Sequence, residues 1–338
     1  MGKPKRLSAL LSIFVITLAL ANGCESGEER TVVIYTAHDQ VFSRTILDRF
    51  EKETGIRVLA QYDTEATKTT GLVERLRRER KAPRCDVFWN NEILRTIRLA
   101  REDTFTPYRS PNAESIPAEF RDAAGLWTGF AARARALAFN PERFAADEVP
   151  RSHDALLDPA WRERIVIANP EFGTTGTHLA ILFATRGETR ARAFLKGLAD
   201  NGVRVVAGNS TSRDRVVAGE AAPGMTDTDD VEVVRRRGEK IDDALYEEDG
   251  VILIPNTVAM VKGGPNPEEA KKLIDFLLSP EVEESLAASS SRQIPLHPDV
   301  PVPDTGLRLS DLKRMPIDYG KAADMLDVAL KAARELLR

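Results

Sequence analysis

Cysteine is scarce in this chain: two of its 338 residues are cysteines, Cys24 and Cys85. Two cysteines exclude the disulfide framework of a small secreted domain, and Cys85, which precedes an apolar run, is predicted to be a buried thiol. The chain is also poor in membrane-spanning patterns. Its uncharged run at 7–21 holds 15 residues, whereas a transmembrane helix needs roughly 20.

Catalytic and nucleic-acid-binding patterns are missing as well. There is no Ser/His/Asp order, no metalloprotease spacing and no phosphate-binding loop with its lysine. A nucleic-acid surface needs a basic stripe with aromatic residues, but the basic run at 75–81 is interrupted by Glu79 and suits the exposed face of a helix. The sequence therefore predicts neither an enzyme nor a partner of nucleic acid.

The first residues differ from everything that follows them. A basic start (Lys3, Lys5, Arg6), the uncharged run and the small residues before Cys24 have the order of a secretory signal. We predict a signal peptide at 1–23. Because Cys24 follows directly, the segment resembles the lipobox of bacterial lipoproteins, which implies lipidation of Cys24 and a tether at 24–30. The alternative is a plain signal peptide with an incidental cysteine.

The remainder has the composition of a soluble globular protein, with 42% hydrophobic and 30% charged residues overall. Short apolar runs alternate with amphipathic segments, which predicts a mostly parallel α/β sheet. Strands are predicted at 31–35, 56–60, 86–89, 126–139, 164–168, 203–206, 224–226 and 250–256. Helices are predicted at 41–53, 67–80, 92–101, 189–200, 211–220, 267–278, 280–288 and 319–338.

A stretch rich in glycine and threonine, Gly173 to Thr177, separates an apolar strand from an apolar helix. The residues in order are Gly173, Thr174, Thr175, Gly176 and Thr177. Glycines permit a tight turn, and the N-terminus of a helix carries partial positive charge, so this stretch is predicted to hold an anionic group. The alternative is an ordinary helix N-cap made by Thr175 or Thr177.

A series of motifs runs in order along nearly the whole chain after the signal. It comprises the lipobox, 34–37, 50–56, 86–89, 132–140, the Gly-Thr stretch, 254–259 and 266–281. Together they resemble the extracellular solute-binding proteins of bacterial ABC importers, and most of all their ferric-iron-binding branch. The resemblance implies a type II periplasmic-binding-protein fold, in which two α/β lobes joined by crossover hinge strands enclose a cleft.

The resemblance also implies where the lobes lie. The first lobe would comprise 31–130 plus 257–338 and the second 138–250, with hinge strands at 127–139 and 250–256. Ligands in open α/β sheets lie beyond the carboxyl ends of strands. This rule selects the residues at 36–39, 62–65, 90–92, 173–177, 209–210 and 226–230.

Within those windows the oxygen donors suit a hard cation such as Fe³⁺. The predicted metal ligands are Asp39, Glu92, Asp227 and Asp229. The predicted anion-binding residues are Thr36, Arg133, Arg135, the Gly-Thr stretch and Asn209. By resemblance the family histidine falls near His38 and the family glutamate near Asn91 and Glu92. The family tyrosine pair falls on Asp227 and Thr228, so this chain lacks it.

These residues leave alternatives open. Asp227 and Asp229 could instead cap the helix that begins near Asp230, His38 could be an ordinary loop histidine, and the arginines could pair with Glu92 or Asp227. The function expected from the resemblance is capture of ferric iron, with phosphate or carbonate as a synergistic anion, for an ABC permease and ATPase. The alternative ligand is a phosphonate or sugar phosphate without metal. The protein is expected to be a monomer, exported to the periplasm and anchored through Cys24.

Overall fold

The computed structural model describes residues 1–2, 30–63 and 69–337. The predicted signal peptide, Cys24 and nearly all of the tether lie outside the described residues, as do Thr64 and Glu65 in one of the ligand windows. Among the residues that are described, no helix is both long and apolar enough to span a membrane.

The first half-sheet is built as the alternating pattern predicts. Parallel strands β1 (Thr31–Thr36), β2 (Arg57–Tyr62) and β3 (Val87–Asn90) lie with β1 in the middle. Their helices are α1 (Gln40–Thr54), α2 (Thr70–Glu79) and α3 (Ile93–Arg101). Helix α1 ends at Gly55, whose positive φ of 66° lets its N–H reach the carbonyl of Glu51, as glycine at that position predicts.

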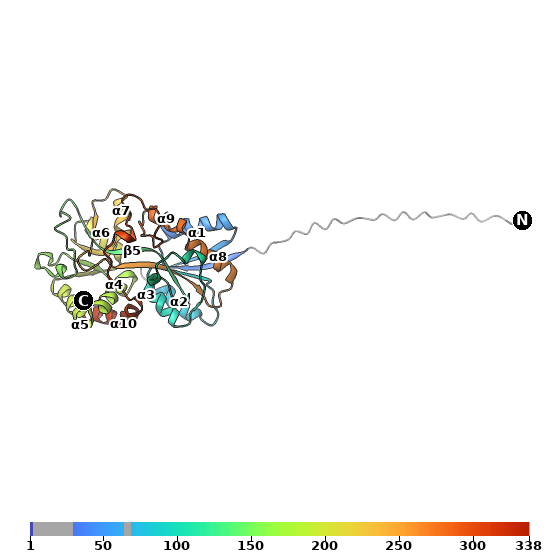
Figure 1. The fold of residues 1–338 in the computed structure, drawn as a ribbon, viewed down its shortest axis with the longest axis horizontal. Helices are drawn as coiled ribbons and strands as arrows, with labels where there is room; N and C mark the ends of the chain where they lie inside the picture. Colours follow the sequence, from blue (N-terminus) through green and yellow to red (C-terminus); the bar gives the residue numbers. More distant parts are fainter. Residues whose placement is uncertain (3–29, 64–68, 338) are drawn as a thin grey trace.

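The second half-sheet joins the first through a long strand, β5 (Thr128–Phe139), which crosses the middle of the molecule in Figure 1. The strands of this half are β6 (Val166–Ala168), β7 (Arg204–Val206), β8 (Gly224–Asp227) and β9 (Asp242–Leu245). Its helices are α4 (Gly173–Arg186), α5 (Glu188–Asp200), α6 (Asn209–Val217) and α7 (Thr228–Arg235). With β10 (Leu253–Val261), the strand order is β2-β1-β3-β10-β5-β8-β6-β7.

The second connecting strand differs from its predicted limits. The sequence predicts an extended run at 250–256, but β10 spans Leu253–Val261 and pairs antiparallel with both β5 and β3. The short strand β4 (Phe105–Thr106) adds to its edge. A register shift between Pro255 and Asn256 lies opposite Ala131, whose φ is +43°. Pairing with β3 and β5 extends β10 beyond the most apolar part of its sequence. The local sequence pattern does not reveal such pairing.

The sequence pattern did not predict strands β4 and β9, whereas it predicted the limits of two helices closely. Strand β9 begins with two aspartates and pairs with the edge of β5, so its composition is atypical of a strand. Helices α8 (Pro267–Leu277) and α9 (Pro280–Ala288) match their predicted ranges within one residue. Short 3-10 helices occupy Pro111–Ala113, Ala118–Phe120, Asp154–Leu157, Pro159–Trp161 and Leu309–Asp311.

The C-terminal helix α10 (Tyr319–Leu336) lies against both halves of the molecule. It packs on α3 from the first half and on α4 and α5 from the second, and Figure 1 shows it beside α5. Arg98 binds the Asp327 carboxylate with an N–O distance of 2.6 Å, and Arg334 binds Glu171 at 2.6 Å. The predicted lobe limits, which place all of 257–338 in the first lobe, stay a prediction.

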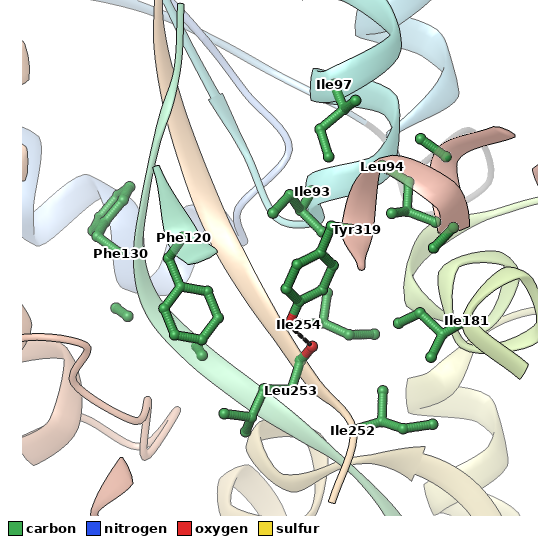
Figure 2. Close-up of a cluster of buried hydrophobic side chains, with 14 of the residues drawn as sticks. Ile93, Leu94, Ile97, Phe120, Phe130, Ile181, Ile252, Leu253, Ile254 and Tyr319 are labelled. Atoms are coloured by element: carbon green, nitrogen blue, oxygen red, sulfur yellow. Dashed lines mark hydrogen bonds between the residues drawn. The ribbon is translucent and has the colours of Figure 1, made fainter. Parts of the chain in front are cut away.

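Apolar side chains fill the space where the connecting strands meet α3, α4 and α10. Figure 2 shows Ile254 of β10, Ile93 of α3, Ile181 of α4 and Tyr319 of α10 in one cluster. The Tyr319 hydroxyl donates to the carbonyl of Leu253 at 2.8 Å. This cluster packs α3, α4 and α10 against the beginning of β10. Cys85 is also buried, as predicted, and burial raises the pKa of its thiol.

Candidate functional site

The candidate site is a cavity of about 240 Å³ into which the N-termini of four helices open. Asp39 precedes α1, Gly173 begins α4, Asn209 begins α6 and Thr228 begins α7. Residues at or beside each of these starts line the cavity. Because helix N-termini carry partial positive charge, the backbone alone favours an anionic group there. Five of the six predicted ligand windows contribute residues to this lining, whereas Tyr62 and Asp63, the described residues of the sixth window, do not.

Carboxylates gather on one wall of the cavity. Oxygens of Asp227, Asp229 and Asp230, at the start of α7, lie within 4.8 Å of one another. Asp227 and Asp229 are two of the predicted metal ligands, and Asp230 is an addition made by the first turn of the helix. Asp39 lines the same cavity from α1. Four aspartates in one cavity provide the countercharge that a hard cation needs.

Arg133 crosses the cavity between the two halves of the molecule. It is 2% exposed, and its Nε donates to the Asp229 carboxylate at 2.8 Å. Its NH1 donates to the carbonyl of Asn91 on the opposite side. Burial alone would lower the pKa of Arg133, but the charges of Asp229 and Asp227 raise it above the ordinary value. Arg133 is therefore a fixed cation beside the acidic wall.

Arg135 lies behind the cavity rather than in it. It is fully buried, and its NH1 donates to Asp227 at 2.7 Å and to the Thr174 hydroxyl at 3.0 Å. This is the structural pairing that the sequence left open. Asp227 also accepts from Thr174 at 2.5 Å and from the Asn209 amide at 2.7 Å. The alternative that Asp227 caps the helix is not met: Asp227 holds the N-cap position of α7, yet its side chain makes no cap hydrogen bond because these partners use it.

The Gly-Thr stretch is helical, so its prediction as a loop is wrong. Helix α4 begins at Gly173 after Phe172, and neither Thr175 nor Thr177 is its N-cap. Of the five residues of this stretch, Gly173 and Thr174 line the cavity and the other three do not. Thr175 donates to Asn209 at 3.2 Å. A β-carbon on Gly176 would lie 2.4 Å from the carbonyl oxygen of Pro170, so this glycine allows close packing rather than ligand contact.

Two other predicted residues lie outside the cavity lining. Glu92 is fully buried, caps α3 by accepting from the backbone of Leu94 at 2.8 Å and of Arg95 at 3.0 Å, and accepts from Thr177 at 2.7 Å. Its oxygens are therefore used within the fold, and we leave it out of the proposed cation site. The buried Thr36 hydroxyl accepts from the His38 backbone at 3.1 Å. Thr36 ends β1 and Glu92 follows β3, but both side chains are buried within the fold.

Asn91 is the residue that sequence reasoning undervalued. It lines the cavity and is 5% exposed, and its Oδ1 has no hydrogen-bond partner among the described residues. An unpaired buried oxygen is costly unless a ligand or water satisfies it. The available signal was its position, one residue after the end of β3. It therefore offers a neutral oxygen opposite the acidic wall.

Two histidines for which the sequence offered no role meet behind Arg135. The Nε2 atoms of His153 and His178 lie 2.7 Å apart, and both side chains are fully buried. Burial, reinforced by the charge of Arg135, lowers the pKa of His178 well below 6.5. Burial also lowers the pKa of His153, although the Asp249 carboxylate opposes this effect. Both rings are therefore neutral in the folded protein near neutral pH.

This pair predicts a loss of stability in weak acid. When the pH falls below 6.5, the histidines of the unfolded chain bind protons while the folded pair stays neutral, so the unfolded state is favoured. We expect the unfolding free energy to fall by about 2 to 4 kcal/mol between pH 7 and pH 5. Urea titrations at both pH values measure it. The double variant His153→Gln/His178→Asn lacks both rings and should lose less, whereas an equal loss would contradict the assignment.

Comparison with known proteins places these features in context. A family model described as bacterial extracellular solute-binding protein matches residues 96–316. Iron uptake protein A1 of Synechocystis sp. is 26% identical over 322 residues, which cover 91% of this chain and 88% of that protein.

Two solved structures have a closely similar fold. Iron-bound HitA from Pseudomonas aeruginosa superposes with a TM-score of 0.83 at 22% identity, over 91% of this chain and 99% of that chain. AfuA from Actinobacillus pleuropneumoniae, with fructose-6-phosphate bound, has a TM-score of 0.80 at 21% identity, over 91% and 99% of the two chains. These likenesses confirm the predicted fold class of two α/β lobes with a cleft between them.

Proposed function

Because this chain belongs to the family of bacterial extracellular solute-binding proteins, we propose that it captures ferric iron together with an anion for an ABC importer. The carboxylate cluster of Asp227, Asp229 and Asp230 carries this proposal. Fe³⁺ is a hard, highly charged ion that prefers oxygen ligands, and carboxylates supply both oxygen and countercharge. The similarity to iron uptake protein A1 and to iron-bound HitA supports the same ligand.

The opposite charges around the cavity support a second, anionic component. Arg133 and Arg213 line it together with the starts of α4 and α6. Guanidinium groups and helix N-termini are both suited to phosphate, carbonate or carboxylate groups. An anion held by these groups would complete the coordination of a metal held by the aspartates. The cavity thus suits a metal–anion pair better than either component alone.

The ligand set would differ from the phenolate pair of the family. None of the five tyrosines of the chain lines this cavity. In their place the start of α7 presents aspartates, and Asn91 adds its amide oxygen from across the cleft. We therefore propose that Asp229, Asp230 and Asn91 contact the metal, with Asp39 nearby and Asp227 fixed beside them by its ion pair with Arg135.

A phosphorylated organic anion is the second candidate. Arg133, Arg213 and the helix starts would accept a sugar phosphate, and AfuA has a similar fold with fructose-6-phosphate bound. Four aspartates lining the same cavity disfavour that ligand, because they outnumber the two arginines of the lining and carboxylates repel a phosphate. The metal–anion pair is the better fit to this balance of charge.

The remaining expectations belong to the same proposal. The family is one of extracellular binding proteins rather than enzymes, and we propose a binding role without catalysis for this chain, as a monomer that delivers its ligand to a permease and ATPase. Export through the signal at 1–23 and a lipid anchor at Cys24 would hold it at the membrane surface of the periplasm. Binding would then close the lobes by a hinge motion that the importer senses.

Ligand-dependent stabilisation tests the proposed function. We expect Fe³⁺ supplied with citrate or phosphate to raise the melting temperature, because a ligand at about 100 times its Kd stabilises the folded state by roughly 2.7 kcal/mol. Citrate or phosphate alone, phosphonates and fructose-6-phosphate serve as the comparison panel. A thermal shift with a sugar phosphate and none with ferric iron would replace the first candidate by the second.

Site variants locate the binding. Asp229→Asn combined with Asp230→Asn should remove the ferric shift, while the exposed Asp200→Asn, whose partner Lys196 lies in α5, should leave it unchanged. Ferric binding that survives the double substitution would place the metal elsewhere.

A further inference from the structure

A line of polar side chains runs away from the cavity; its first three members are buried, and it ends at the partly exposed Asp249. It contains Arg135, His178, His153 and Asp249, contributed by β5, α4, the segment before Asp154 and the segment before β10. Arg186 binds the far oxygen of Asp249 at 2.6 Å. None of the first three residues lines the cavity, so the proposed ligand site does not account for their burial.

The donors and acceptors along this line are compatible with one tautomer of each histidine, and these tautomers fix the order in which protons are donated along it. Arg135 can only donate, and its Nε lies 3.2 Å from His178 Nδ1, so that nitrogen is the acceptor. A neutral His178 then carries its proton on Nε2 and donates to His153 Nε2 at 2.7 Å. His153 in turn carries its proton on Nδ1, which lies 2.5 Å from Asp249 Oδ2.

Two neighbouring contacts support this order. The backbone N–H of His153 also donates to Asp249 Oδ2, at 2.6 Å, which holds the carboxylate against the ring. Arg186 NH2 lies 3.3 Å from His153 Nδ1 but 2.6 Å from Asp249 Oδ1, so its shorter contact is with the carboxylate. Tyr246 stacks on His153 with ring centroids 4.2 Å apart and keeps the imidazole in this plane.

The near end of the line reaches the proposed ligand site. Arg135 NH1 donates to Asp227 and Thr174, both of which line the cavity. The guanidinium is planar, so fixing Nε also fixes the direction of NH1. The position of His178 therefore decides where Arg135 meets Asp227, and thus where the oxygens of Asp227 point relative to those of Asp229 and Asp230.

We propose that His178, held in one tautomer by His153, is a positioning residue for the ligand site, which it serves by orienting Arg135 against Asp227. This role rests on the proposed function for its effect on affinity, but the proton order can be measured without any ligand. An apolar residue at 178 would leave the buried Nε–H of Arg135 unpaired, and the guanidinium would turn to find another acceptor. The aspartate cluster would lose the arrangement that binds metal.

The variant series follows from the geometry of the side chain. Asparagine places Oδ1 where histidine has Nδ1, so His178→Asn keeps the acceptor for Arg135, whereas His178→Leu removes it. With Fe³⁺ supplied as its citrate complex, we expect His178→Leu to weaken binding at least about tenfold and His178→Asn to stay within about threefold of the unaltered protein. Leu273→Ala, a buried change in α8, which contributes no residue to the line or to the cavity lining, should lower stability and leave the Kd unchanged.

Tautomer-sensitive ¹⁵N NMR of the ligand-free protein provides the independent measurement. We expect His178 to be protonated on Nε2 alone and His153 on Nδ1 alone, with the Arg135 Nε–H signal kept in His178→Asn and shifted in His178→Leu. The opposite tautomers, a His178→Leu variant that binds normally, or a His178→Asn variant no better than leucine would overturn the proposal. If the unaltered protein binds no ferric citrate, the proposed function fails, and the NMR signals alone decide the positioning role.

Discussion

Replacing Asp227 by alanine is expected to lower the unfolding free energy by about 3 to 5 kcal/mol, the usual cost of breaking a buried ion pair on one side. Arg135 is fully buried and its NH1 lies 2.7 Å from the Asp227 carboxylate. Without that carboxylate a buried cation is left with only neutral hydroxyl, amide and imidazole acceptors. Urea unfolding followed by circular dichroism measures the loss.

The double variant Asp227→Ala/Arg135→Met separates charge from packing. Because it removes both charges and keeps much of the side-chain volume, it should recover most of the lost stability. Asp200→Ala, which breaks the exposed pair with Lys196, should cost less than about 1 kcal/mol. A loss below about 1 kcal/mol in Asp227→Ala would contradict the expected cost of leaving the buried Arg135 without its counter-ion.

Replacing Glu283 by leucine is expected to be at least as damaging. This carboxylate is fully buried in α9 and accepts from three backbone N–H groups, those of Ala131 at 2.6 Å, Leu296 at 2.9 Å and His297 at 2.8 Å. Each buried donor left without an acceptor costs about 1 to 3 kcal/mol. The sum is comparable with the whole stability of many domains, so we expect little soluble folded protein.

The graded variant Glu283→Gln makes this prediction measurable. Glutamine keeps one acceptor oxygen, so it should fold with a loss between that of leucine and none. Glu284→Gln, at the neighbouring exposed position of the same helix, should change stability by less than about 0.5 kcal/mol. The effect of Glu283→Gln on ligand binding is also informative, because Glu283 accepts from Ala131, which lies at the bulge of the crossing strand β5 with a φ of +43°. A stable Glu283→Leu variant would contradict the inference that the Glu283 carboxylate holds that strand through the Ala131 N–H.

Local patterns were enough to place most of the helices and the parallel strands. Helix α9 begins at its predicted proline, and α1 ends at its predicted glycine, since both residues restrict the backbone independently of their surroundings. Glu283 shows where this reasoning stops. It lies three residues before Leu286, on the buried face of α9, and a charged residue there signals a buried acceptor whose donors only the folded chain identifies.

The predicted site residues likewise divide into those that line the cavity and those whose side chains are used within the fold. The sequence selected strand ends, and the cavity indeed receives Asp39, Arg133, Thr174, Asn209 and the aspartates at the start of α7. It could not separate Asn91 from Glu92, which are adjacent in the chain. Because successive side chains around a strand end point in different directions, one lines the cavity and the other caps α3. Their direction is set by packing rather than by residue type.

The Gly-Thr stretch shows most clearly which features the sequence predicts and which the tertiary structure decides. Its order after an apolar strand determined that a helix start would lie at the edge of the second half-sheet, and Gly173 and Thr174 do line the cavity there. That Thr177 instead donates to Glu92, and that Gly176 packs against Pro170, was decided by the tertiary structure. The sequence by itself determined the α/β fold class and pointed to the strand ends that line the candidate cavity, because strand ends and helix starts are local features. Which oxygens face the ligand depends on contacts between residues far apart in the chain.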